Sequence, residues 1–316
     1  MAEKKIIAVM GATGMQGGGL VRAIVNDPDK EFTARSITRY VNSDKAKILK
    51  DMGAEIVEGD LDKPETIKKA FEGAYGAYCV TFYWAHLSPE KELQHAKTLT
   101  DAVKSAGIKH AIWSTLEDTR KFIPLNDNRM PTLKDKYKVP HFDGKGEADK
   151  FFENSGVPVT FLLVSFYWDN MIFFGSGPKK GEDSKLALTY PLDDKKMAGI
   201  AAEDIGKCAL GIFKNKDKYT GKHIGIAGEH LTGYEMAEKL SKALGKEVVF
   251  NNVSPDVYRS FGFPGADDVG NMFQFYRDFE KEVNTMRNVE NSRALNPSLQ
   301  TFNQWLEKNK HLIPLE

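Results

Sequence analysis

A glycine-rich turn follows the first apolar run of the chain and constrains the fold more than any other feature. Residues 6–10 are all apolar, and Gly11, Gly14 and Gly17 come directly after them at the spacing G-x-x-G-x-x-G. Glycines at such positions permit a tight strand-to-helix turn, close approach of the backbone to a pyrophosphate, and close packing of helix on strand. The start of the helix also offers N–H groups and positive partial charge to phosphates. The turn therefore predicts a dinucleotide site, with a ligand-free glycine turn as the alternative. The residues expected to bind there are Gly11, Thr13, Gly14, Met15, Gln16 and Gly17.

Short apolar runs alternate with longer amphipathic segments behind this turn. The predicted strands are 6–10, 33–38, 55–58, 76–81, 110–114, 160–164 and 223–227. The predicted helices are 17–26, 44–52, 64–71, 89–106, 144–154 and 202–213. Strands that alternate with helices imply βαβ units, so we expect an α/β fold with a doubly wound parallel sheet of the Rossmann type.

The regular rhythm ends near residue 165, and the remainder predicts a smaller α+β domain. Its expected elements are helices at 233–244 and 255–261, a strand at 246–252, and a helix whose aromatic face includes Phe273 and Phe275. We therefore expect a nucleotide-binding Rossmann domain over 1–165 and 200–228. A smaller substrate or partner domain is expected over 166–199 and 229–316.

Composition excludes several classes of function. Lys+Arg and Asp+Glu both total 44 in 316 residues, so no net charge favours nucleic acid or an anionic membrane surface. Cys79 and Cys208 are far apart and lie in apolar segments, which predicts two buried thiols rather than a disulfide. No cluster has metal-ligand spacing, and no segment is long and apolar enough to span a bilayer. We expect a protein of the cytoplasm, with the nucleus as a second compartment, that has no metal and no direct contact with nucleic acid or membrane.

The end of the second predicted strand indicates which dinucleotide is preferred. An NAD site usually places an acidic residue there, but this strand ends in Thr38-Arg39. Because a guanidinium binds a 2′-phosphate through charge-assisted hydrogen bonds, Arg39, assisted by Lys45, predicts NADP(H). The alternative for Arg39 is a solvated surface charge. After the third strand, Asp60 and Leu61 are expected beside the adenine, or Asp60 is simply a residue at the start of a helix.

Two further loops follow predicted strands at the edge where a cofactor would lie. Thr81, Phe82 and Tyr83 come after the fourth strand, and Phe166 and Tyr167 come after the sixth. We expect these residues to contact cofactor, with packing against the second domain as the alternative; core packing is expected for the neighbouring Trp168.

Several segments resemble those of a known protein family. The glycine turn, the Thr38-Arg39 strand end and the Gly59-Asp60 turn are similar to those of atypical short-chain dehydrogenase/reductases. The run from His141 to Glu147 and the run from Gly262 to Asp268 narrow the resemblance to the NmrA-like family, in particular to its vertebrate NmrA-like domain type. The resemblance covers nearly the whole chain. It implies NADP(H) binding and redox-responsive regulation, including transcriptional regulation, through a protein partner.

The resemblance also locates the positions that are catalytic in active relatives. These relatives use Tyr-x-x-x-Lys on the helix after the fifth strand, and the matching residues here are His141 and Lys145. The lysine is therefore expected to bind the nicotinamide ribose, with a solvated helix lysine as the alternative. Ser114 matches a serine that orients a substrate carbonyl. His141 stands where the tyrosine would be, as a proton donor or, as we favour, a structural histidine before a helix.

The missing tyrosine favours one function over another. We expect an NADP(H)-binding redox sensor that regulates a protein partner without dehydrogenase turnover; a homodimer is a second candidate assembly. The alternative is an active NADPH-dependent reductase of a small carbonyl or quinone. The polar, proline-containing segment 116–140 has no clear period and is predicted to have little core and to be mobile.

Overall fold

The predicted alternation of strands and helices is present in the computed structural model, which describes residues 4–181 and 184–315. These residues form two compact units. The first comprises 4–118, 144–164 and 202–224, and the second comprises 119–143, 165–181, 184–201 and 225–315. The predicted Rossmann domain over 1–165 and 200–228 included 119–143, which this division assigns to the second unit, together with 165, 200–201 and 225–228.

A seven-stranded sheet forms the centre of the first unit, with the order β11-β6-β5-β4-β1-β2-β3. Its strands are β1 (Lys5–Val9), β2 (Phe32–Thr38), β3 (Glu55–Glu58), β4 (Gly76–Cys79), β5 (His110–Thr115), β6 (Val159–Leu163) and β11 (His223–Gly225). The pairs from β6 through to β3 are all parallel. Both the predicted strands and the predicted Rossmann-type sheet are therefore confirmed.

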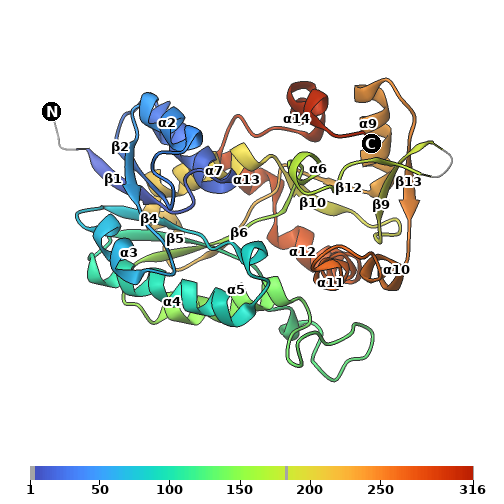
Figure 1. Ribbon diagram of the computed structural model, residues 1–316, viewed down its shortest axis with the longest axis horizontal. Helices are drawn as coiled ribbons and strands as arrows, with labels where there is room; N and C mark the ends of the chain where they lie inside the picture. The colour runs from blue at the N-terminus through green and yellow to red at the C-terminus, as the bar shows by residue number, and fades with distance from the viewer. Residues whose placement is uncertain (1–3, 182–183, 316) are drawn as a thin grey trace. The chain divides into compact units, whose positions relative to one another are not determined.

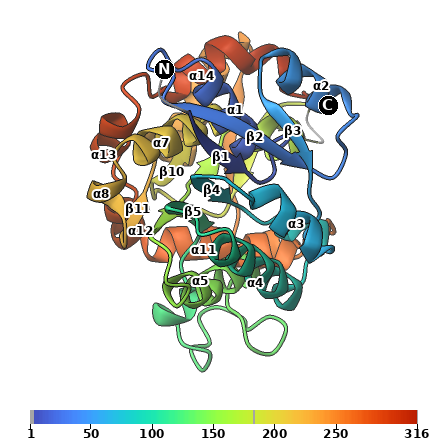
Figure 2. The same cartoon turned by 90° about the vertical axis from the view of Figure 1, so that its left-hand side faces the viewer.

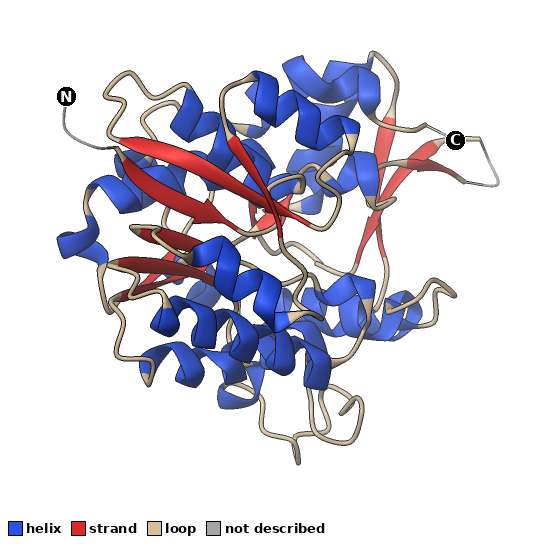
Figure 3. Cartoon of the chain, turned by 60° about the vertical axis from the view of Figure 1, so that its left-hand side comes forward, coloured by secondary structure: helices blue, strands red, loops and turns tan. Residues whose placement is uncertain are grey.

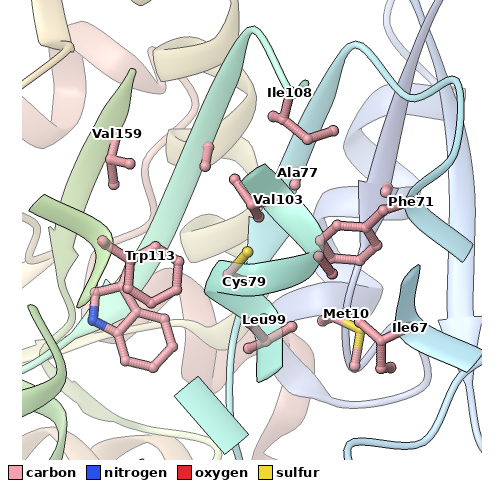
Figure 4. Packing of buried hydrophobic residues seen from close by; sticks show 14 of the residues in the cluster. Met10, Ile67, Phe71, Ala77, Cys79, Leu99, Val103, Ile108, Trp113 and Val159 are labelled. Atoms are coloured by element: carbon pink, nitrogen blue, oxygen red, sulfur yellow. The ribbon is translucent and has the colours of Figure 1, made fainter. Parts of the chain in front are cut away.

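Helices cover both faces of this sheet (Figures 2 and 3). They are α1 (Met15–Val25), α2 (Asp44–Asp51), α3 (Pro64–Phe71), α4 (Pro89–Ser105), α5 (Pro140–Glu153), α7 (Ala202–Lys214) and α8 (Lys216–Tyr219). Helices α3, α4 and α5 contribute to one core with the strands, in which Phe71, Leu99 and Trp113 are fully buried (Figure 4). Cys79 lies in the same core, and Cys208 is buried in α7, as predicted for two thiols that form no disulfide.

The second unit is built from short strands and many helices (Figure 1). Two three-stranded sheets have the orders β12-β10-β7 and β13-β9-β8. The strands are β7 (Phe166–Tyr167), β8 (Lys179–Lys180), β9 (Leu186–Tyr190), β10 (Met197–Ile200), β12 (Glu229–Leu231) and β13 (Val248–Asn252). The helices are α6 (Asn170–Phe173), α9 (Gly233–Leu244), α10 (Pro255–Arg259), α11 (Ala266–Asp278), α12 (Glu280–Met286), α13 (Val289–Leu295) and α14 (Phe302–Asn309).

The segment before α5 has a core of its own, contrary to the prediction. Ile123, Met130, Tyr137 and Val139 are completely buried. Asn271 of α11 donates from Nδ2 to the carbonyl oxygens of Pro131 (3.0 Å) and Lys138 (2.5 Å). The backbone carbonyls that a loop leaves unpaired are thus bonded by side chains of a neighbouring helix. A polar sequence with three prolines gave no sign of these partners.

Candidate functional site

The glycine turn after β1 has the geometry that the sequence predicts. Gly11 has φ +61°, a conformation that favours glycine, and its carbonyl accepts the N–H of Gly14 at 2.8 Å. A Cβ on Gly17 would lie 2.5 Å from the carbonyl oxygen of Gly11 and 2.6 Å from that of Met10. Gly17 therefore allows α1 to pack directly on the turn, whereas Gly11 and Gly14 are exposed.

The first turn of α1 is open to an anion. Gly14 is the N-cap residue, and among the described residues no side chain caps this helix and no acid occurs in its first turn. Its first N–H groups keep their hydrogen-bonding capacity and their positive partial charge. Thr13, Met15 and Gln16 line the turn as half-buried residues. The sheet order reverses beside β1, which pairs with β2 on one side and with β4 on the other. Ligands of such sheets bind at this switch point, outside the carboxyl ends of the strands.

The orientation of α1 depends on a second close approach. A Cβ on Gly206 of α7 would lie 2.1 Å from the backbone of Gly19 and Leu20, so the two helices touch through glycine. Arg22 of α1 also forms an ion pair with Glu203 of α7. These contacts fix the helix whose N-terminus faces the switch point.

Two cations lie near the end of β2. Arg39 and Lys45 are exposed, and the Arg39 guanidinium lies 5.6 Å from the ring centre of Tyr40. Ser43 caps α2 by accepting the N–H of Ala46 at 3.3 Å, which places Lys45 in the first turn of that helix.

Asp60 is a turn residue rather than a helix cap. Its Oδ1 accepts the N–H of Asp62 at 3.1 Å, and the N-cap residue of α3 is Lys63. The structure therefore contradicts the alternative that Asp60 begins the helix. Leu61 beside it is half-buried.

Ser114 and Gln16 are brought together. The buried Ser114 hydroxyl donates to Oε1 of Gln16 at 2.8 Å, and the hydroxyl of Tyr78 donates to the same oxygen. This amide thus links α1 to β4 and β5, and the hydrogen of the Ser114 hydroxyl is used within the protein.

Lys145 and Thr81 are also brought together, with a glutamate that sequence reasoning missed. The Lys145 ammonium donates to Oγ1 of Thr81 at 2.6 Å and lies 2.7 Å from Oε1 of Glu92. Thr81 Oγ1 in turn donates to that same oxygen of Glu92. The ammonium is also 5.1 Å from the ring centre of Trp113, within the range of a cation–π contact. Lys145 is therefore a buried, paired lysine, and the alternative of a solvated helix lysine is wrong.

The neighbours of Glu92 stabilise its negative charge. This side chain is completely buried, and His86 Nε2 lies 3.4 Å from its Oε2. Burial alone would raise the pKa of Glu92, but the Lys145 ammonium, together with His86 and Thr81, lowers that pKa to about 2. The site thus contains a stable carboxylate–ammonium pair.

Glycines beside Lys145 explain how its helix reaches this place. A Cβ on Gly146 would lie 2.4 Å from the backbone nitrogen of Asp118, so only glycine fits where α5 passes the segment after β5. Two glycines weaken a helix by about 1 kcal/mol each relative to alanine, and this close approach accounts for one of them.

His141 lies in the second unit and is hydrogen-bonded to Asp268 of α11. Its Nδ1 is 2.6 Å from Oδ1 of Asp268, and its backbone N–H donates to Oδ2 of the same carboxylate at 3.2 Å. The prediction that His141 precedes the helix is wrong, because α5 begins at Pro140, four residues before the predicted start. Proline suits a first helical turn, and Asp143 accepts the N–H groups of Lys138 and Val139 just ahead of it.

The predicted aromatic contacts divide into exposed and buried residues. Phe82 is 53% exposed, whereas Tyr83 is buried with its ring 5.7 Å from that of His86. Phe166 is buried in the second unit, with ring centres 5.9 Å from Tyr190 and 6.0 Å from Phe273. Phe166 therefore packs among aromatic side chains of the second unit. Tyr167 is half-buried in β7 of the same unit.

Core packing is confirmed for Trp168. The side chain is 1% exposed, and its ring lies 5.2 Å from Phe302 and 6.4 Å from Trp305.

Glu92 is a site residue that the sequence did not single out, and Asp268 was named only as the last residue of the run from Gly262. Glu92 lies in the first turn of α4, where an acid usually complements the helix dipole. Its spacing from His95, Ala96 and Leu99, which are all buried, was the available signal, because it places Glu92 on the buried face.

Within residues 4–181 and 184–315, no group of side chains could hold a metal ion, and no helix is both long and apolar enough to cross a bilayer.

These features define a Rossmann-type protein with a glycine-rich turn for a dinucleotide and a buried lysine–glutamate pair. Comparison with known proteins gives the family. The sequence profile described as the NmrA-like family matches residues 3–306. The chain therefore belongs to the NmrA-like family, as the resemblance of its motifs predicts.

Named relatives include both proteins without a stated activity and oxidoreductases. An NmrA-like family domain-containing protein of Dictyostelium discoideum is 28% identical over 286 residues, covering 88% of each chain. The NmrA-like family domain-containing oxidoreductase FrzB of a Cladobotryum species is 29% identical, covering 85% of this chain and 83% of its own. Among solved structures, the negative transcriptional regulator NmrA in complex with NADP matches with a TM-score of 0.79 and 23% identity, over 96% of this chain and 95% of that one.

Proposed function

We propose that this chain is an NADP(H)-binding regulatory protein, a redox sensor that responds to the cofactor without turning it over. The observation that carries the proposal is the uncapped N-terminus of α1 behind the exposed Gly11 and Gly14. A pyrophosphate fits there because no Cβ occupies the turn, and the helix supplies N–H groups and positive partial charge. Family membership supports the same group, since NmrA was solved with NADP and also with NAD.

The preference for NADP(H) is assigned to the end of β2. Arg39 and Lys45 are exposed cations at this place, where an NAD site would have an acid. A 2′-phosphate would gain charge-assisted hydrogen bonds from the guanidinium. Asp60 and Leu61 are the residues we assign to the adenine side, and Thr81, Phe82 and Lys145 to the ribose and nicotinamide side.

The bound cofactor would supply a hydride for a reduction. The residues at the catalytic positions of this chain do not favour such a reaction. The position of the tyrosine in active relatives is taken by His141, whose ring and backbone are both bonded to Asp268. The Ser114 hydroxyl, which would orient a carbonyl, donates to Gln16. The groups that a reductase would use are thus committed to contacts within the fold.

A sensor needs a recipient for its signal. We assign nucleotide binding to the first unit and propose that the second unit binds a regulatory protein partner or a second copy of the chain. The cytoplasm, with the nucleus as a second place of action, fits such a role.

An NADPH-dependent reductase is the second candidate, since FrzB is named an oxidoreductase. Two measurements separate the candidates. Calorimetry with NADPH should detect binding, and the absorbance of NADPH in the presence of carbonyls and quinones should stay constant. An absence of binding would refute both candidates, whereas steady NADPH oxidation would select the reductase.

A further inference from the structure

Three atoms form a closed set of hydrogen bonds at the end of β4. The Lys145 ammonium donates to Thr81 Oγ1 and is paired with Glu92 Oε1, while Thr81 Oγ1 donates to Glu92 Oε1. A hydroxyl has one hydrogen to donate and lone pairs to accept, so each donor and acceptor in this ring has a consistent role. Two of the three ammonium hydrogens are thereby committed. The next acceptor, the carbonyl oxygen of Thr81, is 3.5 Å away and binds the third only weakly.

The other oxygen of Glu92 faces a histidine whose proton can be placed. The backbone N–H of Ser88 donates to His86 Nδ1 at 3.1 Å, so Nδ1 is an acceptor and the ring proton is on Nε2. That N–H lies 3.4 Å from Glu92 Oε2. Among the described residues neither of these two atoms has a hydrogen-bond partner, so the carboxylate is held at one oxygen, by Lys145 and Thr81, and has His86 as a close neighbour at the other.

We propose that Glu92 is a positioning residue for the cofactor lysine. Its buried carboxylate holds the ammonium of Lys145 so that one N–H is left to donate to a ribose hydroxyl of the dinucleotide. This inference rests on the proposed NADP(H) binding and adds to it the group through which Lys145 acts. A carboxylate buried without its ammonium, or the reverse, would be strongly unfavourable, which explains why the two occur together.

A double-mutant cycle tests this role. Glu92→Gln keeps the size of the side chain and one acceptor oxygen, replaces the other oxygen by an NH₂ donor, and removes the charge. We expect calorimetry to show NADPH affinity about tenfold lower, as for the loss of one charge-assisted hydrogen bond. In the Lys145→Met background the same change should have no further effect, because Glu92 acts through Lys145. An equal loss in both backgrounds, or no loss in either, would overturn the proposal.

A second measurement uses the protein without cofactor. Mass spectrometry after brief treatment with an amine-acetylating reagent reports how readily each lysine reacts. We expect Lys145 to react severalfold faster in Glu92→Gln than in the wild type, with exposed Lys47 as the internal reference. Glu90→Gln, an exposed acid in the same first turn of α4, is the matched control and should change neither measurement.

The two measurements also separate this inference from the proposed function. If the wild type binds no NADPH, the proposed function fails, and the labelling result alone decides whether Glu92 holds Lys145; unchanged labelling refutes the inference. If Glu92→Gln does not fold, Glu92→Asp retains the charge but shortens the side chain. It should then raise Lys145 labelling, and unchanged labelling would again refute the inference.

Discussion

Arg39 has the clearest expected effect at the scale of the single residue. It is an exposed guanidinium at the end of β2, and it would interact with the one phosphate that distinguishes NADPH from NADH. Such a contact contributes about 1.5–3 kcal/mol, so wild-type protein should prefer NADPH by roughly tenfold to a hundredfold. Arg39→Ala should remove most of this preference. Calorimetric titrations with both cofactors measure it, and Lys50→Ala, an exposed cation in the last turn of α2, is the control. Equal affinities in the wild type would contradict the assignment.

The buried His110 allows a prediction of how the free energy of unfolding depends on pH. Thr160 uses its hydroxyl hydrogen on the carbonyl of Tyr219, so it accepts from His110 Nε2 at 2.9 Å; among the described residues Nδ1 has no hydrogen-bond partner. Burial, with a smaller contribution from Lys216, lowers the pKa of His110 from 6.5 to about 4. The unfolded chain therefore binds a proton more readily than the folded protein between these values, and stability falls as pH falls from 6.5 to about 4.

This loss has an expected size and a direct test. The lowered pKa of His110 corresponds to about 3 kcal/mol between pH 6.5 and pH 4, as an order of magnitude. Urea unfolding at steps of pH measures the slope. His110→Gln, which cannot titrate, should have a flatter profile, and the difference between the two proteins cancels the other titrating groups. Parallel profiles would mean that His110 does not carry the effect.

The roles of residues at turns and strand ends could be predicted from the sequence. The partners that the fold brings next to them could not. The glycines, Arg39 and Lys145 were identified because their spacing from strands is fixed by the turn and by the resemblance. Glu92 is far from Lys145 in sequence, and its pairing depends on how α4 and α5 pack. His141 was expected before a helix because the predicted helix began at residue 144, whereas α5 begins at Pro140; the close approach at Gly146 was invisible in the sequence.

At the scale of the element, the two glycines at the start of α1 should respond differently to the same substitution. Gly14 has φ −93°, which any residue adopts, and a Cβ there would be 3.2 Å from the nearest atom. Gly14→Val should fold but lose NADPH binding, because the side chain fills the space that the pyrophosphate needs. Gly17→Val should lower the melting temperature markedly, since its Cβ would overlap backbone carbonyls. Thermal unfolding and calorimetry on both variants test this, and normal NADPH binding by Gly14→Val would show that the turn has been misinterpreted.

The strands of the first unit were predictable because each is an apolar run between turn signals. Parallel strands buried on both faces give such runs, as β1 and β5 do. Two strands of the second unit, β7 and β8, have two residues each, too few to produce a period. The expectation that the segment 116–140 has little core was wrong for a related reason. Backbone carbonyls of this segment are bonded by Asn271 and by the buried Lys138, whose ammonium donates to the carbonyls of Asp127 and Met130. Contacts of this kind leave no local pattern in the sequence.

At the scale of the whole molecule, a binder without chemistry can still act if it has two conformations. The cofactor then shifts their ratio by its differential affinity for them. A partner that prefers one conformation must change the affinity for NADPH by the same factor with which NADPH changes affinity for the partner. Such couplings typically amount to about fivefold to a hundredfold. This reciprocity distinguishes a sensor from a protein that merely stores cofactor.

The hypothesis that this protein is a redox sensor predicts a combination of results that a reductase would not give. Hydrogen exchange should differ between the apo and NADPH-bound protein at backbone amides beyond the glycine turn, because the ligand shifts a conformational equilibrium as well as covering its own site. In the same preparation, NADPH should not be oxidised above background by any carbonyl or quinone tested. Identical exchange outside the turn would remove the basis for a sensor. Robust turnover that disappears in His141→Ala would assign the missing proton donor to His141 and make the protein a reductase.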